Sequence, residues 1–146
     1  MILNAENQSL GRLLAYAAKK ALGGDEVLIV NAEKAILSGK KEKIFQKNLD
    51  KGDIKNSGNY TKGPFHQKRP DRFVRKAVRG MLPYDKPRGV QAFKRITVYI
   101  GVPENEIKEK HNIDVKKEKI QELNFKKNFE EYVTVEELCR FIGGSW

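Results

Sequence analysis

The residues of this sequence best suited to chemistry are four cations that recur at helical spacing within residues 70–81: Arg72, Arg75, Lys76 and Arg79. On a helix that turns about 100° per residue, these side chains fall in one sector. The only acidic residue of the segment is Asp71, in the first turn, where the helix dipole favours a negative charge. Near neighbours of like charge repel each other, and a bound anion relieves that repulsion. The pattern therefore predicts a helix face that binds a polyanion.

The opposite side of the same segment is apolar. Its members are Phe73, Val74, Ala77, Val78 and Met81. On a helix they share one sector about 140° wide, which is typical of a face buried against a core. We therefore predict a helix over residues 70–81 that docks by its apolar side and presents its cations to a partner. Because proline suits the first turn of a helix, Pro70 marks the start.

The segment before this helix adds further cations beside aromatic rings. Lys62, Lys68 and Arg69 lie among Tyr60 and Phe65. Exposed nucleobases stack on aromatic side chains, so this mixture favours RNA as the polyanion. The alternative interpretation is that Tyr60 and Phe65 pack in the protein core.

His66 lies in the same segment and belongs to the candidate RNA-binding residues. A metal-binding role is not expected, because the only other histidine is His111 and neither has a cysteine or acidic cluster beside it. We expect no metal and no cofactor.

Basic residues elsewhere in the chain complete the candidate RNA-binding set. The whole set comprises Arg12, Lys40, Lys41, Lys62, His66, Lys68, Arg69, Arg72, Arg75, Lys76, Arg79, Lys86, Arg88, Lys94 and Arg95. Phosphate contacts position a protein on RNA but carry no direct base information. The cationic helix face contains no Asn or Gln that could read adenine. We therefore expect binding dominated by charge and RNA shape.

The positive charge is concentrated in the centre of the 146-residue chain. The formal net charge is +10 and the sequence pI is about 9.7, above the value of roughly 9 that indicates nucleic-acid binding. Residues 40–95 carry 17 basic and five acidic side chains, whereas residues 1–39 are balanced and residues 96–146 are net −2. Counterion release depends on phosphates neutralised together, so this concentration favours a polyanion partner over a merely solvated basic face.

Two glycine-containing motifs could suggest nucleotide chemistry, but neither fits. Gly-Gly-Asp-Glu at 23–26 resembles the signature of diguanylate cyclases, yet it follows a predicted helix, where Gly-Gly is ordinary capping sequence. Ser-Gly-Lys-Lys at 38–41 lacks the earlier glycine and the final Ser or Thr of a P-loop. The carboxylates Glu6, Glu33 and Asp50 show no spacing that suggests acid–base work. We expect neither an enzyme nor a small-molecule substrate.

The basic helix needs a core to hold it, and the N-terminal part of the chain predicts one. Apolar spacing predicts a helix from about residue 10 that is capped by Ser9 and ended by Gly23 and Gly24. The continuous apolar run at 27–30 predicts a strand buried on both faces, as in a parallel sheet. With a short first strand at 1–4, these elements predict a βαβ unit and an α/β fold.

The remaining segments predict a single domain with a charged tail. We expect a short polar helix at 40–50, an extended loop with at most one strand at 51–69, a short helix at 89–95 and a strand at 96–100. Thr134 and Glu137 fit a capping box before a short terminal helix. The sequence therefore predicts an α/β core domain over residues 1–103 and a charged C-terminal extension over residues 104–146.

Cysteine content and hydropathy predict the compartment. The single cysteine, Cys139, can form no intramolecular disulfide, which suits a reducing cytoplasm, and we expect it to be a small buried apolar residue. No apolar stretch approaches the roughly 20 residues of a membrane span. Residues 1–4 lack the basic start of a signal peptide. We expect a cytoplasmic protein without a membrane partner.

Seven short motifs resemble, in order, the ribosomal protein L13 family of the large subunit. They are Leu-Gly-Arg-Leu at 10–13, Val-Asn-Ala-Glu at 30–33, Ser-Gly-Lys-Lys at 38–41, Gly-Pro-Phe-His at 63–66, Ala-Val-Arg-Gly-Met-Leu-Pro at 77–83, Arg-Gly at 88–89 and Val-Tyr-Ile-Gly-Val-Pro at 98–103. The motif at 63–66 resembles the archaeal and eukaryotic branch. The resemblance covers roughly residues 1–103, and residues 104–146 match less distinctively.

The resemblance implies a three-layer α/β/α fold with a four-stranded, mainly parallel sheet. It also implies a structural constituent of the large ribosomal subunit that contacts large-subunit ribosomal RNA and neighbouring ribosomal proteins, supports early subunit assembly and has no catalytic activity.

Two other functions stay open from the residues themselves. One is a nucleotide-binding α/β enzyme, which would need a glycine-rich loop after the first strand, where residues 5–9 contain no glycine. The other is a free regulatory RNA-binding protein, which composition alone does not distinguish from a ribosomal one.

Overall fold

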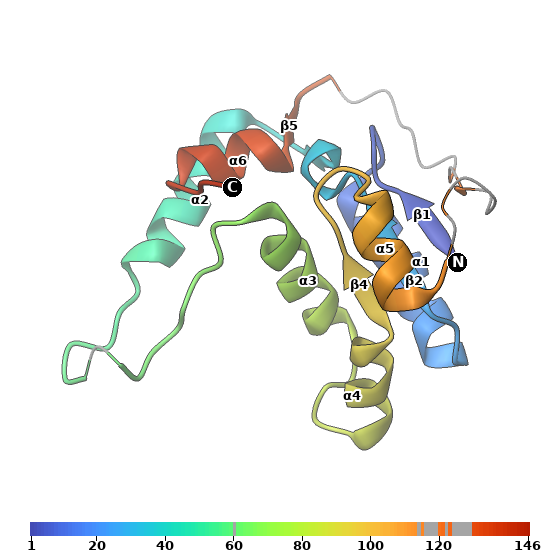
Figure 1. Ribbon diagram of the computed structural model, residues 1–146. Helices are drawn as coiled ribbons and strands as arrows, with labels where there is room; N and C mark the ends of the chain where they lie inside the picture. The colour runs from blue at the N-terminus through green and yellow to red at the C-terminus, as the bar shows by residue number, and fades with distance from the viewer. Residues whose placement is uncertain (60, 114, 116–119, 122, 124–129) are drawn as a thin grey trace.

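The computed structural model describes residues 1–59, 61–113, 115, 120–121, 123 and 130–146 (Figure 1). In chain order the elements are β1 (Ile2–Asn4), α1 (Leu10–Gly23), β2 (Val27–Val30), the 3-10 turn η1 (Ala32–Lys34), β3 (Ile36–Ser38), α2 (Lys41–Asp53), α3 (Pro70–Met81), α4 (Pro87–Lys94), β4 (Ile96–Val98), α5 (Glu104–His111), β5 (Tyr132–Thr134) and α6 (Val135–Phe141). Among the described residues, no helix has both the length and the apolar character needed to cross a membrane.

A βαβ unit begins the fold, as the sequence predicts. β1 and β2 pair in parallel with Ile2 opposite Leu28, and α1 connects them. α1 ends at Gly24, whose φ of 111° lies in the left-handed region that glycine tolerates. All four residues of β2 are buried because β1 and β4 flank this strand and apolar clusters cover both of its faces.

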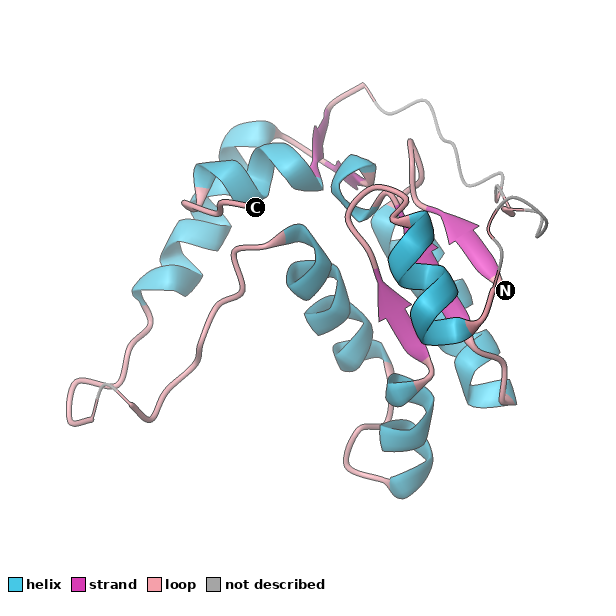
Figure 2. Cartoon of the chain, in the orientation of Figure 1, coloured by secondary structure: helices cyan, strands magenta, loops and turns pink. Residues whose placement is uncertain are grey.

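The sheets of the described residues are a three-stranded parallel sheet and a separate two-stranded sheet (Figure 2). The parallel sheet has the order β1–β2–β4, and β3 pairs with β5 in antiparallel orientation. This is a mixed α/β fold, but the expected four-stranded sheet is not confirmed. On the edge of β1 that faces away from β2, the Asn4 N–H donates to the Gln121 carbonyl at 3.1 Å, and the Gln121 N–H donates to the Ile2 carbonyl at 2.9 Å. Gln121 therefore forms an isolated parallel bridge beside β1.

Two apolar clusters lie against the parallel sheet. Because successive strand residues point to opposite faces, Leu3 and Ile29 join the cluster that includes α1, α3 and α4, whereas Ile2 and Leu28 join the cluster that includes Ile107 of α5. The larger cluster is the one on which the basic helix α3 docks.

The predicted helix over residues 70–81 is confirmed with the same bounds. Pro70 occupies its first turn, and Val74 and Val78 have no solvent exposure. Phe73 and Ala77 are partly buried against the larger cluster. The apolar face does not extend to Met81, which is 44% exposed, because the helix ends there and the chain turns away into Leu82.

α2 and the loop that follows it extend away from the sheet (Figure 1). The helix has no fully buried residue. Its contacts with the body include Phe45, whose ring stacks on Phe141 with centroids 4.2 Å apart, and Lys41, whose ammonium lies 3.5 Å from Glu137. In the described part of residues 54–69 there is no strand.

The C-terminal elements β5 and α6 share the core with the N-terminal part, which sequence analysis did not anticipate. Val135 and Cys139 belong to the larger cluster, and β5 pairs with β3 although the two strands lie far apart in the chain. Thr134 caps α6 by accepting the Glu137 N–H at 3.2 Å, as predicted. β5 and α6 are therefore not a detached extension, although the boundary between residues 103 and 104 stays a prediction.

Cys139 is fully buried, which confirms its prediction as a small apolar residue. Burial raises the pKa of its thiol to about 12, with a smaller contribution from Asp71 in the first turn of α3. The thiol is therefore neutral and packs as an apolar group at the contact between α6 and α3.

The end of the chain packs closely on the segment that leads into α3. The Gly144 N–H donates to the Cys139 carbonyl at 2.8 Å and so terminates α6. A Cβ atom added to Gly144 would collide with the Lys68 carbonyl oxygen and would lie 2.8 Å from the Cys139 carbonyl oxygen. Because only glycine fits, the C-terminal turn fixes the backbone position of Lys68.

We expect Gly144→Ala to lower the free energy of unfolding by about 1–3 kcal/mol, the usual cost of forcing extra atoms into a packed site. Urea denaturation of the full chain measures this. Gly11→Ala is the matched control, because an added Cβ in this first turn of α1 meets nothing within 4 Å, so this variant should be at least as stable as the unaltered protein. Equal stability of both variants would contradict the packing at Gly144.

Candidate nucleic-acid interface

The four cations of α3 lie on its solvent side, opposite the buried valines. Arg72, Arg75, Lys76 and Arg79 are all exposed, whereas Val74 and Val78 are fully buried. The apolar face is therefore what turns the cations outward, because a helix that buries one side must expose the other. In this part the structure agrees with the geometry predicted from the sequence.

Two of these arginines lie over aromatic rings of the segment that follows. The Arg79 guanidinium carbon is 4.1 Å from the ring centroid of Tyr84, and that of Arg75 is 4.9 Å from the ring centroid of Phe93. The two rings contact each other edge to face, with centroids 5.5 Å apart and planes at 86°. Sequence analysis did not single out Tyr84 or Phe93, because neither residue has a spacing that points to α3.

A tight turn holds Tyr84 in place beside α3. The Lys86 N–H donates to the Pro83 carbonyl at 3.0 Å, and the Gly89 N–H donates to the Lys86 carbonyl at 2.9 Å. A Cβ on Gly89 would collide with the Pro83 carbonyl oxygen. Gly89 is therefore a packing requirement of this turn, and the turn sets where α4 begins.

The loop before α3 is tied to the helix by a lysine. The Lys76 ammonium donates to the Phe65 carbonyl at 3.2 Å, and the Phe65 ring itself is 63% exposed. The alternative that Phe65 packs in the core is therefore wrong. Tyr60, the other aromatic residue of that prediction, lies outside the described residues.

Burial makes the imidazole of His66, in the same loop, less basic. Burial lowers the pKa of its imidazole, and the positive charges of Lys76 and Lys51 lower it further. Its Nε2 atom is buried without a hydrogen-bond partner among the described residues. At neutral pH the ring is therefore neutral and can contribute a hydrogen bond but no charge.

The other basic residues of the loop differ in how free they are. Arg69 pairs with Asp71, with 3.2 Å between the guanidinium nitrogen and the carboxylate oxygen. Lys62 and Lys68 are exposed, and Lys68 is held at its backbone by Gly144. These three residues lie in the loop that connects α2 to α3.

Two arginines of the candidate set are directed at the end of α1. A guanidinium nitrogen of Arg95 donates to the Ala21 carbonyl at 3.3 Å, and one of Arg88 lies at 3.5 Å from the Leu22 carbonyl. Cations at this position interact favourably with the negative end of a helix. Sequence reasoning missed this capping role, because a cation that caps a helix and one that binds phosphate have the same sequence signature.

The remaining candidates lie on other parts of the surface. Lys86 and Lys94 are exposed at the two ends of α4, and Arg12 is exposed on α1. Lys40 and Lys41 line a shallow hollow together with Glu42, Glu130 and Glu131, so their charge is partly balanced. The structure therefore groups the loop and α3, with α4 beside them, and leaves Arg12, Lys40 and Lys41 outside this group.

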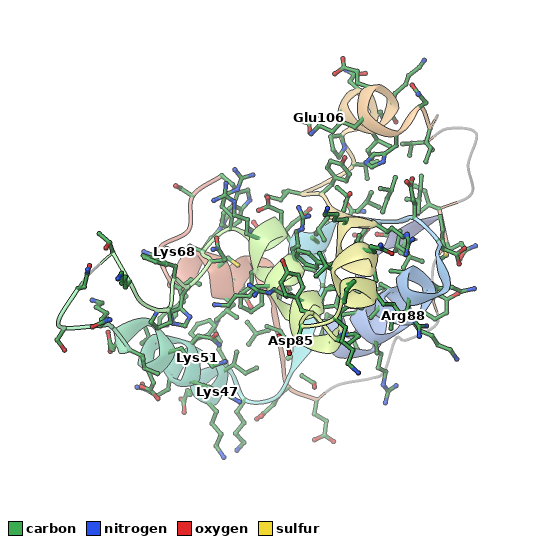
Figure 3. All side chains as sticks on the ribbon, turned by 90° about the horizontal axis from the view of Figure 1, so that it is seen from below. Lys47, Lys51, Lys68, Asp85, Arg88 and Glu106 are labelled. Carbon is green, nitrogen blue, oxygen red and sulfur yellow. The ribbon has the colours of Figure 1, made fainter. Side chains whose placement is uncertain are left out.

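A row of lysines on α2 was not in the predicted set. Lys43, Lys47 and Lys51 are spaced four residues apart and are all exposed, and Figure 3 shows Lys47 and Lys51 on α2 in the same part of the molecule as Lys68. The four-residue spacing is the signal in the sequence that could have found them. Lys51 is close enough to His66 to affect its pKa, so the row adjoins the basic loop.

Acidic side chains occur on α2, which carries Glu42, Asp50 and Asp53, and also on α5. α5 carries Glu104, Glu106 and Glu109, and Figure 3 shows Glu106 well separated from the lysines of α2 and from Lys68. Within the part of the chain that the structure describes, no group of three or more His, Cys, Asp or Glu residues could hold a metal ion. The α2, loop and α3 side exposes ammonium and guanidinium groups, which are groups that can bind phosphate.

Comparison with known proteins shows the family of this chain. The family model described as Ribosomal protein L13 matches residues 1–105. The large ribosomal subunit protein uL13 of Methanococcus maripaludis is 47% identical over 100% of this chain and 99% of its own length. The proteins of the same name from Methanocaldococcus jannaschii and Thermoplasma volcanium are 36% and 38% identical, over 99% and 98% of this chain and 98% of their own lengths. This chain therefore belongs to the ribosomal protein L13 family.

Proposed function

We propose that this protein is a structural constituent of the large ribosomal subunit that binds large-subunit ribosomal RNA through the exposed cations of α3 and the basic loop before it. The observation that carries the proposal is the division of α3 into a face buried by Val74 and Val78 and a face of four exposed cations. Membership of a family of structural ribosomal proteins means that the chain is not an enzyme. Its role is to hold RNA segments together and to support early assembly of the subunit.

The binding is dominated by charge and RNA shape. The α3 face offers its cations to phosphate oxygens and has no amide side chain for reading base edges. The neighbouring Phe65, at 63% exposure, offers a ring on which an unpaired base can stack. RNA is thus favoured over double-helical DNA, whose bases are not available for stacking.

The site residues stand in an order of expected importance. Arg72, Arg75, Lys76, Arg79, Lys68 and Lys62 carry the main contacts. Lys43, Lys47 and Lys51 extend the surface along α2, whereas Arg88 and Arg95 act mainly on the end of α1. Arg12, Lys40, Lys41, Lys86 and Lys94 bind other RNA segments or neighbouring ribosomal proteins.

The proposal places the protein in the cytoplasmic ribosome, with ribosomal RNA and neighbouring large-subunit proteins as its partners. A free regulatory RNA-binding protein is the remaining alternative. Sedimentation separates the two, because a ribosomal constituent co-migrates with large subunits at physiological salt, whereas a regulator stays in the slowly sedimenting fraction.

We further infer that the three-stranded sheet is completed by a fourth strand at the β1 edge, within a three-layer arrangement. The two hydrogen bonds that join Gln121 to Ile2 and Asn4 support this position. The apolar clusters on the two sides of the sheet support the layers. We also propose that residues 1–103 form the RNA-binding domain and that residues 104–146 are its C-terminal extension.

Replacement of Arg72, Arg75, Lys76 and Arg79 by alanine should weaken binding to large-subunit and small-subunit ribosomal RNA alike. For each phosphate that the variant no longer neutralises, the log–log dependence of the association constant on salt should flatten by about 0.7 to 0.9. Filter binding of the full chain to deproteinised RNA at several KCl concentrations measures both effects.

The matched control removes the same number of positive charges from α1 and α5. It replaces Lys19, Lys20, Lys108 and Lys110 with alanine. This control should bind with nearly the slope of the unaltered protein. If the α3 variant keeps the salt slope of the unaltered protein, α3 is not the RNA-binding face and the proposal fails.

The imidazole of His66 should titrate below its ordinary pKa of 6.5, because burial and two lysines disfavour its charged form. The folded state then binds fewer protons than the unfolded state, so His66 contributes stability that is present above pH 6.5 and is lost as the pH falls through the folded pKa. NMR titration of the free protein measures the midpoint. Added RNA should raise it, because phosphates offset the lysine charges, and a midpoint that RNA leaves unchanged would place His66 outside the interface.

A further inference from the structure

We propose that Arg75, Phe93, Tyr84 and Arg79 form one built site, a pair of guanidinium groups held by two aromatic rings to grip two phosphates of a single RNA strand. This inference rests on the proposed function and deepens it, because it assigns Tyr84 and Phe93 as positioning residues. Neither ring need touch RNA. Each acts by fixing the arginine above it.

The spacing of the two arginines suits such a grip. Arg75 and Arg79 are four residues apart on one face of α3, which separates them by about 6 Å along the helix axis. Successive phosphates along a strand are separated by a distance of the same order. The two guanidinium groups are therefore placed for neighbouring phosphates of one strand rather than for one shared phosphate.

The aromatic rings fix the orientation of the guanidinium groups. Tyr84 lies 4.1 Å from the Arg79 guanidinium and Phe93 lies 4.9 Å from that of Arg75. The negative face of a ring attracts the cation, and the N–H groups on the edge of the guanidinium stay available for two parallel bonds to phosphate. Lysine offers no such planar edge, which gives the site a reason to contain arginine.

The rings are themselves fixed, so the site is preorganised. Tyr84 and Phe93 meet edge to face at 5.5 Å, and the turn that carries Tyr84 is closed by the Pro83 and Gly89 contacts. Arg88 and Arg95 connect α4 to the end of α1. Because the arginine side chains are held before RNA arrives, less conformational entropy is lost on binding.

The test uses the full chain with Tyr84→Leu and Phe93→Leu combined, which removes both rings and leaves every charge in place. Binding to deproteinised large-subunit ribosomal RNA should weaken roughly five- to 150-fold, because the two arginine side chains then lose their conformational freedom only when RNA binds. The salt slope should stay that of the unaltered protein, because the number of cations is unchanged. Arg79→Lys alone should weaken binding with an unchanged slope, and it should add little once Tyr84→Leu is present.

Two further variants and a competitor separate positioning from mere structure. Tyr84→Phe with Phe93→Tyr keeps both rings and should restore the affinity of the unaltered protein. Tyr16→Leu is the matched control, because Lys20 lies over that ring at 5.8 Å on α1, and it should leave RNA affinity unchanged. If the site is built for an RNA strand, inorganic pyrophosphate should compete with RNA only weakly, and to the same extent in all ring variants. Strong competition that disappears in the ring-free variant would assign the site to free phosphates instead and overturn the RNA assignment.

The outcome also distinguishes this inference from the function on which it rests. If the ring-free variant binds RNA as the unaltered protein does while neutralisation of the α3 cations abolishes the salt-dependent binding, α3 binds RNA but the rings do not position it. If ring removal lowers the melting temperature and the affinity is restored at a temperature where the variant is fully folded, the rings only stabilise the fold. If neither set of variants changes binding, both the inference and the proposed function fail.

Discussion

The interaction on which the rest of this structure depends is the burial of one side of α3. Val74 and Val78 are completely withdrawn from solvent against α1 and the parallel sheet, and full burial of each such side chain contributes about 1.5–3 kcal/mol. Since helix geometry couples the two sides, the same burial holds Arg72, Arg75, Lys76 and Arg79 on the outer surface with a fixed spacing. Intrahelical ion pairs do not offset this like-charge row, so its electrostatic cost has to be carried by core packing until an anion is bound.

The elements around α3 can be understood as supports for that face. The turn before α4 supplies the ring beneath Arg79, and α4 supplies the ring beneath Arg75. This segment is tied to α1 because Arg88 and Arg95 donate hydrogen bonds to carbonyl groups at the C-terminal end of α1. On the other side, the C-terminal turn at Gly144 packs on the backbone of Lys68, and the stacked rings of Phe45 and Phe141 hold α2 against α6. The basic surface is thus assembled from α2, the loop with α3, and α4. α6 and the turn after it connect α2 to the loop, although α6 carries few cations itself.

Much of this could be predicted from the sequence, and what could not follows a physical pattern. The bounds of α3, the βαβ unit and the capping of α6 by Thr134 depend on local spacing, and local spacing is visible in a sequence. The pairing of β3 with β5 is not, because three-residue strands carry no clear periodicity and their partners are far apart in the chain. For the same reason residues 104–146 were expected to form an extension, whereas Val135 and Cys139 lie in the core. The separate roles of Arg79 and Arg95 could not be told apart either, because the difference lies in which atoms surround each guanidinium and not in the residue type.

The most direct test of the central claim is a density map of the large ribosomal subunit that contains this protein. The cationic side of α3 should face ribosomal RNA, with the guanidinium groups of Arg75 and Arg79 within about 4 Å of phosphate oxygens and with Val74 and Val78 still directed to the sheet. A map in which this side of α3 faces open solvent, or packs on another protein without RNA beside it, would contradict the claim.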